Sequence, residues 1–259
     1  MPRDLAALAQ EDSLQGMPEL THSPEPAMDA ADEDSMFRSL AKRSVSQRDA
    51  LHPYTQTLSP SDIESCLRVE EEAFPPNERC TREKPQFQYR LRHCGELSLG
   101  IFTSLTDSAT ATAATSAPVY SGAPKRKSVL LGHIIATKTT TPTVTDAAMA
   151  IPPPSSPSTH PSASDQETAG HQEAGRTICI HSLAVLPEYQ GRGLGRTLMR
   201  AYLQRIGSHG VADRAALIAH EGLVGYYEGL GFTNEGKSAV EFAGGGWVDM
   251  VKILEEEGE

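Results

Sequence analysis

The sequence predicts an α/β (α+β) domain over residues 49–254, because strand-like and helix-like segments alternate along this range. With 38% hydrophobic and 22% charged residues, the chain can bury a normal core. Two low-complexity blocks, 103–127 and 138–175, have neither the periodicity nor the large apolar side chains that a core needs. Without these inserts and the two ends, roughly 140 residues remain, which is the size of a typical single domain.

The first half of the domain is expected to contain three strands and two helices. Ser59-Pro60-Ser61-Asp62 is typical of a helix N-terminus, since it offers a cap, a proline in the first turn and an acid near the positive end of the helix dipole. Pro75-Pro76 should end that helix. The expected elements are a strand at 51–58, helices at 59–74 and 86–93, and strands at 97–102 and 129–136.

The second half is organised around one strand, one glycine loop and one helix between Ile180 and Arg196. The helix is indicated by apolar residues that recur at helical spacing and so share one face. Further strands are expected at 214–219, 232–242 and 247–254, with a helix at 222–230. The apolar face consists of Leu194, Leu198, Met199, Tyr202, Leu203 and Ile206.

The glycine loop predicts a pyrophosphate site. Unpaired backbone N–H groups and the positive end of the dipole meet where a helix begins, and Gly191, Gly193 and Gly195 let the backbone approach a phosphate closely. The P-loop pattern requires a Gly-Lys-Ser/Thr ending that is missing, and the Rossmann pattern requires a glycine where Arg196 stands. A glycine turn that merely caps a surface helix is the alternative.

Charge is concentrated at the two ends of the chain. Residues 1–36 hold nine acids and one arginine, net −8, and residues 255–259 add −4, so the net −11 leaves the remainder at +1. The acidic region 1–48 and the acidic tail 255–259 are expected not to fold. A nearly neutral body argues against nucleic-acid binding and suits an enzyme that acts on small molecules.

Cysteine usage and hydropathy bear on compartment and cofactors. Cys66, Cys80, Cys94 and Cys179 are too few and too scattered for a disulfide scaffold or a Cys-x-x-Cys zinc site, so no metal is expected. No apolar run reaches the about 18 residues of a membrane span, and no signal peptide is apparent after Met1. We therefore expect a cytoplasmic protein without a membrane partner.

The loop Gln190-Gly191-Arg192-Gly193-Leu194-Gly195 fits the pattern Gln/Arg-x-x-Gly-x-Gly/Ala and resembles the acetyl-CoA-binding motif of the GNAT superfamily of N-acetyltransferases. Leu183-Ala184-Val185 resembles the strand that precedes that motif. The resemblance implies a GNAT fold over residues 49–254: a central mixed, mostly antiparallel sheet flanked by helices. It also implies acetyl-CoA as co-substrate.

Residues 94–100, 180–185 and 223–232 resemble the arylalkylamine (serotonin) N-acetyltransferase group. Residues 72–79 resemble its fungal branch, whose members are also described as polyamine acetyltransferases. The resemblance implies that the primary amine of an arylalkylamine, such as serotonin or tryptamine, attacks the acetyl-CoA thioester directly. Spermidine or putrescine is the alternative acceptor, and a catalytically weak acyl-CoA-binding module is a third interpretation.

The resemblance assigns three catalytic candidates. His181 would be the base, acting through water, because a histidine pKa near 6.5 suits removal of the amine proton. Tyr227 would protonate the departing thiolate. Where the animal enzymes carry a first histidine this chain has Cys179, so His181 would work alone or with a carboxylate, for which Glu72 is the candidate. The structural alternatives are a buried sheet histidine, a core tyrosine and a solvated acidic helix face.

The resemblance also assigns binding residues. Backbone amides of Leu183 and Val185 would meet the acetyl carbonyl and the pantetheine arm, while the loop would surround the pyrophosphate. Phe74, Pro76 and Trp247 match apolar positions of the acceptor pocket, whereas a polyamine would need carboxylates from the segment 71–78. The pyrophosphate residues would be Gln190, Gly191, Arg192, Gly193, Gly195 and Arg196.

The N-terminal region carries a short regulatory pattern. Lys42-Arg43-Ser44-Val45-Ser46 resembles a basophilic kinase site, and animal relatives are regulated through terminal phosphorylation. A phosphorylation-dependent partner of this region is therefore a further hypothesis, with chance occurrence of the pattern as the alternative. The small-molecule amine remains the main expected partner.

Overall fold

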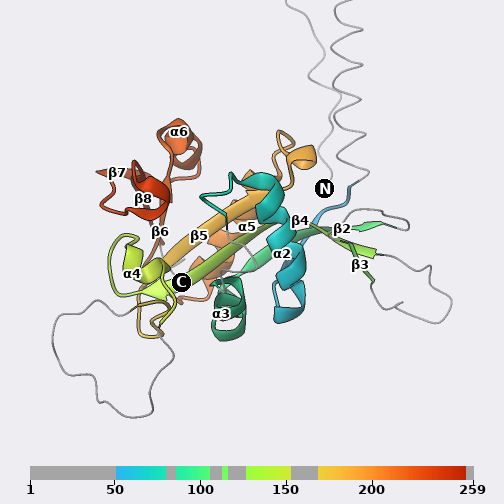
Figure 1. Cartoon of the computed structure of the whole chain (residues 1–259), viewed down its shortest axis with the longest axis horizontal. Coiled ribbons are helices and arrows are strands. Elements are labelled where there is room, and N and C mark those ends of the chain that lie inside the picture. Colours follow the sequence, from blue (N-terminus) through green and yellow to red (C-terminus); the bar gives the residue numbers. More distant parts are fainter. Residues whose placement is uncertain (1–50, 80–85, 106–112, 116–126, 153–168, 255–259) are drawn as a thin grey trace, which may run out of the picture. The chain divides into compact units, whose positions relative to one another are not determined.

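The computed structural model describes residues 51–79, 86–105, 113–115, 127–152 and 169–254. They form an eight-stranded sheet of order β1-β2-β4-β5-β6-β8-β7, with β3 also paired to β4 (Figure 1). Within this described sheet, β5 and β6 are the one parallel pair, which confirms the predicted mixed, mostly antiparallel sheet. The strands are β1 Tyr54–Thr57, β2 Leu99–Leu105, β3 Ala113–Thr115, β4 Lys127–Thr139, β5 Thr177–Val185, β6 Arg214–Ala219, β7 Thr233–Lys237 and β8 Val248–Ile253.

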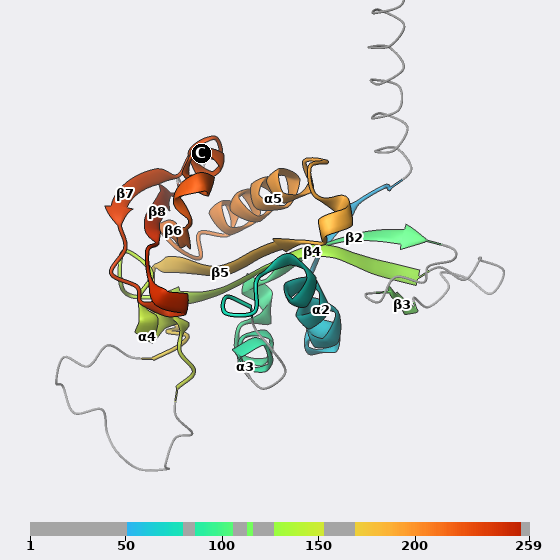
Figure 2. The ribbon, with the colours of Figure 1, turned by 45° about the horizontal axis from the view of Figure 1, so that its top comes forward.

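Helices cover both faces of the sheet. Helix α5 (Leu194–Ser208) packs on β2, β4 and β5 from one side, whereas α2 (Ile63–Ala73) and α3 (Gln86–His93) lie on the other side (Figure 2). The shorter helices are α4 (Asp146–Met149) and α6 (Val224–Glu228). In the described part of the chain, no helix is long and apolar enough to cross a membrane.

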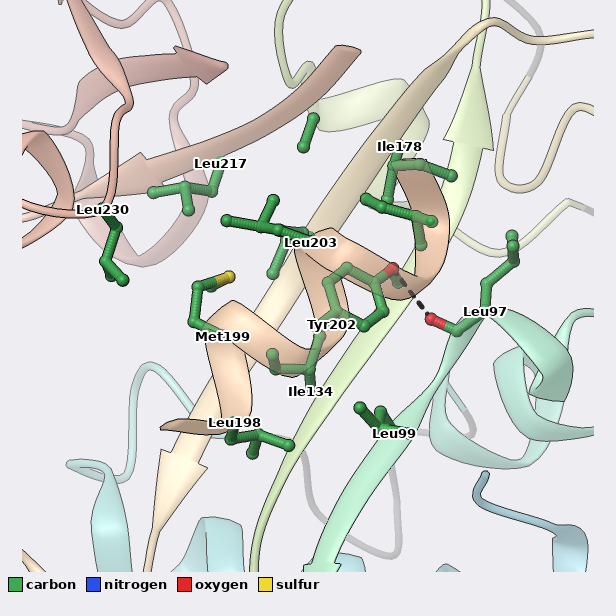
Figure 3. Packing of buried hydrophobic residues seen from close by; sticks show 14 of the residues in the cluster. Leu97, Leu99, Ile134, Ile178, Leu198, Met199, Tyr202, Leu203, Leu217 and Leu230 are labelled. Atoms are coloured by element: carbon green, nitrogen blue, oxygen red, sulfur yellow. Dashed lines mark hydrogen bonds between the residues drawn. The ribbon is translucent and has the colours of Figure 1, made fainter. Parts of the chain in front are cut away.

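The apolar face predicted for α5 is confirmed, because all six of its residues are buried. They pack against the sheet, including Leu217 of β6, and against Leu230, which follows α6 (Figure 3). Tyr202 is the one polar group on this face, and its hydroxyl donates a 2.9 Å hydrogen bond to the carbonyl of Leu97. This bond satisfies the buried phenol and ties α5 to the 3₁₀ turn Gly95–Leu97 that precedes β2.

Helix α2 begins and ends where the sequence predicts. The Ser59 N–H donates to the Asp62 carboxylate at 2.8 Å, a short 3₁₀ turn over Pro60–Asp62 leads into the helix, and Pro75 follows soon after its end. Its buried residues are Cys66, Leu67, Val69 and Glu70. Three of these are ordinary core residues, and the fourth is a carboxylate.

The two low-complexity blocks contribute more than expected. β2 and β4 extend into the first block, and β3 lies inside it, because strand pairing needs backbone hydrogen bonds rather than large side chains. In the second block, the Thr145 hydroxyl caps α4 by accepting a 3.1 Å hydrogen bond from the Ala148 N–H. Val144 and Ala148 are buried beside Trp247, so this block contributes residues to the core although its composition does not indicate one.

Several predictions fall outside the described residues. They are the acidic region 1–48 with its kinase-site pattern, residues 106–112 and 116–126 of the first insert, residues 153–168 of the second, and the tail 255–259. All described elements belong to one unit that starts at Gln47.

Candidate active site

Strands β5 and β6 separate soon after they meet. Their parallel pairing covers only Thr177–Cys179 against Arg214–Ala216, while β5 stays paired with β4 as far as Val185. The edge of β5 that faces away from β4 is therefore open over residues 180–185 of the described sheet. An open strand edge offers backbone N–H and C=O groups to an extended ligand.

The predicted amides face this open edge. The Leu186 N–H donates to the Leu131 carbonyl at 2.9 Å, which directs Leu186 toward the β4 side. Because neighbouring residues of a strand direct their backbone groups to opposite edges, Val185 and Leu183 face away from β4. The side-chain amide of Gln190 donates to the Val185 carbonyl at 2.9 Å, which confirms this orientation and anchors the loop to the strand.

The glycine loop has the conformation that its sequence requires. Gly191 and Gly193 have φ of +69° and +80°, a region that disfavours residues with a side chain. A Cβ at either position would meet nothing within 4 Å, so the space above the loop is open. Gly193 is the N-cap of α5 and no side chain caps that helix, which leaves the N–H groups of its first turn suited to an anion.

The remaining predicted loop residues have structural contacts of their own. Arg192 donates to the Glu188 carbonyl at 3.0 Å and lies 5.2 Å from the centre of the Tyr189 ring. The Arg196 guanidinium lies 5.8 Å from the centre of the Tyr226 ring. A Cβ at Gly195 would come within 3.2 Å of the Tyr226 hydroxyl, so this glycine allows α5 and α6 to approach each other.

A cavity of about 310 Å³ lies beside the open edge of β5. It is lined by residues of α2, α3, α4, β5, β6 and α6 and of the connection between β7 and β8. Its walls include five of the predicted site residues, whereas the predicted Glu72 and Pro76 are exposed and do not line it. The five are Phe74, His181, Leu183, Tyr227 and Trp247.

Helix α2 brings Glu70 to the cavity in place of Glu72. Glu70 is buried and lines the cavity, because it follows Cys66 by four residues and precedes Phe74 by four. Glu72 falls on the opposite, solvated side of the helix. The helix register therefore places Glu70, and not the predicted Glu72, at the cavity.

His181 lies between two side chains on the cavity wall. Its Nε2 is 2.8 Å from the Thr137 hydroxyl of β4, and its Nδ1 is 3.9 Å from the Cys179 sulfur. Burial, with the positive charge of Arg90, lowers the pKa of His181 well below its usual value, so the imidazole is neutral at pH 7. Burial raises the pKa of the Cys179 thiol to about 12, so this thiol cannot serve as a base at neutral pH.

Tyr227 and its neighbour Tyr226 occupy different places. Tyr227 lines the cavity, and burial, with a smaller effect of Tyr226, raises the pKa of its phenol, which is therefore protonated at neutral pH. Tyr226 packs edge-on against it at 5.1 Å and points toward α5 instead. Tyr227 is thus the tyrosine that can deliver a proton into the cavity.

A chain of contacts joins three segments around the cavity. The Asp146 carboxylate of α4 accepts hydrogen bonds from the N–H groups of Glu241 and Phe242 at 2.9 and 3.1 Å. The Trp247 indole N–H donates to the Phe242 carbonyl at 2.7 Å, and its ring lies 4.2 Å from that of His220. The second insert thus fixes the aromatic wall of the cavity, although the sequence assigned it no role.

Two more groups that the sequence did not indicate complete the walls. His220 Nε2 lies 3.1 Å from a carboxylate oxygen of Glu78, which links β6 to the end of the segment that follows α2. Arg90 of α3 is buried and donates to the Met149 carbonyl at 2.9 Å. Within residues 51–254, apart from the gaps named above, no group of three or more His, Cys, Asp or Glu side chains is arranged to hold a metal ion.

Residues 139–254 match the family model of the acetyltransferase (GNAT) domain. Over these residues the chain matches a GNAT acetyltransferase domain, which confirms the prediction made from the glycine loop. A 70-residue segment is 39% identical to the serotonin N-acetyltransferase of Mesocricetus auratus and 34% identical to that of Homo sapiens. This segment is 27% of the chain and spans 34% of the length of either relative.

Two solved structures support the fold at low sequence identity. The loading GNATL domain of CurA from Lyngbya majuscula matches with a TM-score of 0.53 and 11% identity, over 78% of this chain and 98% of that domain. The GphF GNAT-like decarboxylase, solved in complex with isobutyryl-CoA, matches with a TM-score of 0.52 and 14% identity, over 78% of this chain and all of that one, 100%. At such identities the likeness shows the fold alone, and it confirms the predicted GNAT fold.

Proposed function

We propose that this protein is an acetyl-CoA-dependent N-acetyltransferase that acetylates the primary amine of an arylalkylamine such as serotonin or tryptamine. The observation that carries the proposal is a single cavity that combines two proton acceptors, a protonated tyrosine and an aromatic wall beside the open edge of β5. The similarity of one segment to serotonin N-acetyltransferases points the same way.

The cofactor side would hold acetyl-CoA through its backbone. The outward amides of Leu183 and Val185 suit the extended pantetheine arm, and the uncapped start of α5 behind Gly193 suits the pyrophosphate. Acetyl-CoA supplies the acetyl group as a thioester. On the cofactor side the protein presents neutral backbone N–H donors, and Arg192 and Arg196 add positive charge at the loop.

The reaction requires one proton to leave the amine and one to reach the sulfur. An alkylammonium ion with a pKa near 10.4 must lose a proton before its nitrogen can attack the thioester carbonyl. The new C–N bond forms as the C–S bond breaks, and the electron pair of that bond leaves on sulfur. Glu70 and the neutral His181 line the cavity and can accept the first proton, while Tyr227 can supply the second.

The acceptor side favours an aromatic amine. Phe74 and Trp247 provide apolar wall, and the Trp247 ring is already fixed by its hydrogen bond and by His220. An indole or phenyl ring fits between such surfaces through burial and ring contacts. The carboxylates that a polyamine would need are also present, since Glu78 and Asp146 line the cavity, but both are already paired within the protein.

Thiol release from acetyl-CoA by the full chain tests the proposal. The panel comprises tryptamine, serotonin, phenethylamine, spermidine, putrescine and a lysine peptide. Selective turnover of the three aromatic amines is the expected result. Selective turnover of spermidine would indicate a polyamine acceptor bound by the carboxylates of the cavity. CoA binding without any turnover would support an acyl-CoA-binding module instead.

A further inference from the structure

Three polar side chains meet between α2 and the sheet in an otherwise apolar layer. Glu70 of α2 is 2% exposed, His133 of β4 is 0% exposed and Ser182 of β5 is 8% exposed. Around them lie the apolar residues that pack α2 on the sheet, among them Leu130, Ile135 and Ala184. Burial of such groups is costly unless they hydrogen-bond to one another, so their contacts decide what they do.

Both partners bind the same oxygen of Glu70. His133 Nε2 lies 3.0 Å from Glu70 Oε1 and 3.2 Å from the Ser182 hydroxyl oxygen. The Ser182 hydroxyl also donates to Glu70 Oε1. Two donors from neighbouring strands thus converge on one carboxylate oxygen.

The surroundings of Nδ1 show which of the two ring nitrogens of His133 carries the hydrogen. His133 Nδ1 is buried, and no hydrogen-bond partner faces it in the described structure. A hydrogen placed there would be an unsatisfied buried donor, so the hydrogen belongs on Nε2 and points at Glu70. The ring is held at this angle by Phe87, whose ring packs edge-on at 5.5 Å and 81°.

We propose that His133 is a positioning residue for the acyl transfer, holding the Glu70 carboxylate by its Nε2–H so that Glu70 takes the proton of the acceptor amine. The proposal rests on the proposed function. Ser182 shares this task from the adjacent strand. Glu70 has to be oriented at the cavity wall, and two aligned donors on one oxygen hold it there.

Other charged groups line the same cavity. They come from the segment after α2, from α3, from α4 and from the neighbouring strand β5. They are Glu78, Arg79, Arg90, Asp146 and His181.

A pair of amide substitutions tests the proposal. Glutamine places its amide nitrogen three bonds from Cβ, as histidine places Nε2, whereas asparagine places its nitrogen two bonds from Cβ, as histidine places Nδ1. His133→Gln keeps a donor toward Glu70 and should retain kcat within about threefold, while His133→Asn should lose about 10- to 100-fold, the range for a lost hydrogen bond to a charged group. The KM for acetyl-CoA should stay unchanged in both.

A double-mutant cycle with His133→Asn separates positioning from packing. In a Glu70→Gln background the same substitution should change kcat by less than about twofold, because its effect passes through Glu70. If the His133 variants fold poorly, Ser182→Ala can replace them, and it should lower kcat by a smaller factor than His133→Asn.

Equal kcat for His133→Gln and His133→Asn, or an undiminished effect of His133→Asn in the Glu70→Gln background, would overturn the role of His133. Failure of the unaltered protein to acetylate any amine would instead refute the proposed function, and the role of His133 with it.

Discussion

The proposed cofactor side and the proposed acceptor side of this site are built in different ways. The cofactor side comes from one continuous segment, Leu183 to Arg196, in which a strand edge, a glycine loop and a helix start follow one another. The acceptor cavity gathers residues from six helices and strands and from the loop before β8. A continuous segment encodes its geometry locally, so its sequence motif is readable, whereas a cavity assembled from distant segments depends on the completed fold.

The largest effect is expected at the loop. Gly193→Val should weaken CoA binding on the order of 100-fold, because a β-branched residue disfavours φ of +80° and its side chain would fill the space above the loop. Isothermal titration with CoA measures this. Gly207→Val is the matched control, since Gly207 has no positive φ and open space around its Cβ. Equal affinity of the two variants would remove the loop from the cofactor site.

The second-largest effect is expected at the proposed proton donor. Tyr227→Phe should lower kcat about 100-fold with little change in CoA affinity, because only the phenol that lines the cavity can protonate the leaving thiolate. Tyr226→Phe is the control, and its kcat should stay within about twofold of that of the unaltered protein. If steady-state kinetics showed a larger loss of kcat for Tyr226→Phe than for Tyr227→Phe, α6 would present Tyr226 as the proton donor instead.

The two glutamates of α2 give a third contrast. Glu70→Gln should lower kcat about 10- to 100-fold, whereas Glu72→Gln should leave it unchanged, since Glu70 is buried at the cavity and Glu72 is solvated. Steady-state kinetics with tryptamine measures both. A loss confined to Glu72→Gln would show that the helix register does not choose the carboxylate.

A smaller effect is expected from the second insert. Asp146→Ala should raise the KM for the acceptor amine about three- to tenfold, because the N–H groups of Glu241 and Phe242 lose their acceptor and the aromatic wall loosens. The KM for acetyl-CoA should not change. Asp213→Ala is the control, since Asp213 forms an exposed ion pair with Arg176 away from the cavity.

The smallest expected effect is on the pH dependence of folding stability. The pKa of His181 is lowered in the folded state, mainly by burial and then by Arg90, so below about pH 6.5 the unfolded chain binds a proton that the folded chain does not. Stability should therefore fall as the pH drops from 7 toward 5. Thermal unfolding of His181→Asn should show a shallower fall, and an identical slope would contradict a His181 that stays neutral in the folded protein.

The parts of the structure that depend on local sequence are those that the sequence could predict. The bounds of α3 and β6 follow from local periodicity and agree with the expected ranges 86–93 and 214–219. Glu70 can also be predicted from the sequence, because it continues the apolar stripe of Ile63, Cys66 and Leu67 in α2 at helical spacing. The choice of Glu72 followed the resemblance and not this register.

The rest of the cavity was not readable in the same way. Asp146 reaches Phe242 across 96 residues, and His220 reaches Glu78 across 142. Neither pair leaves a local pattern, and Asp146 sits in a block whose composition indicates a loop. Such contacts arise only when the sheet order brings distant segments together.

The affinity of a tryptamine–CoA bisubstrate conjugate tests most directly whether the two sides form one site. Measured by isothermal titration on the full chain, it should bind on the order of 100-fold tighter than CoA, because it joins both halves without the entropic cost of bringing two ligands together. Trp247→Ala should remove most of that gain and leave CoA binding unchanged. A conjugate that binds no tighter than CoA would contradict an aromatic acceptor site in this cavity.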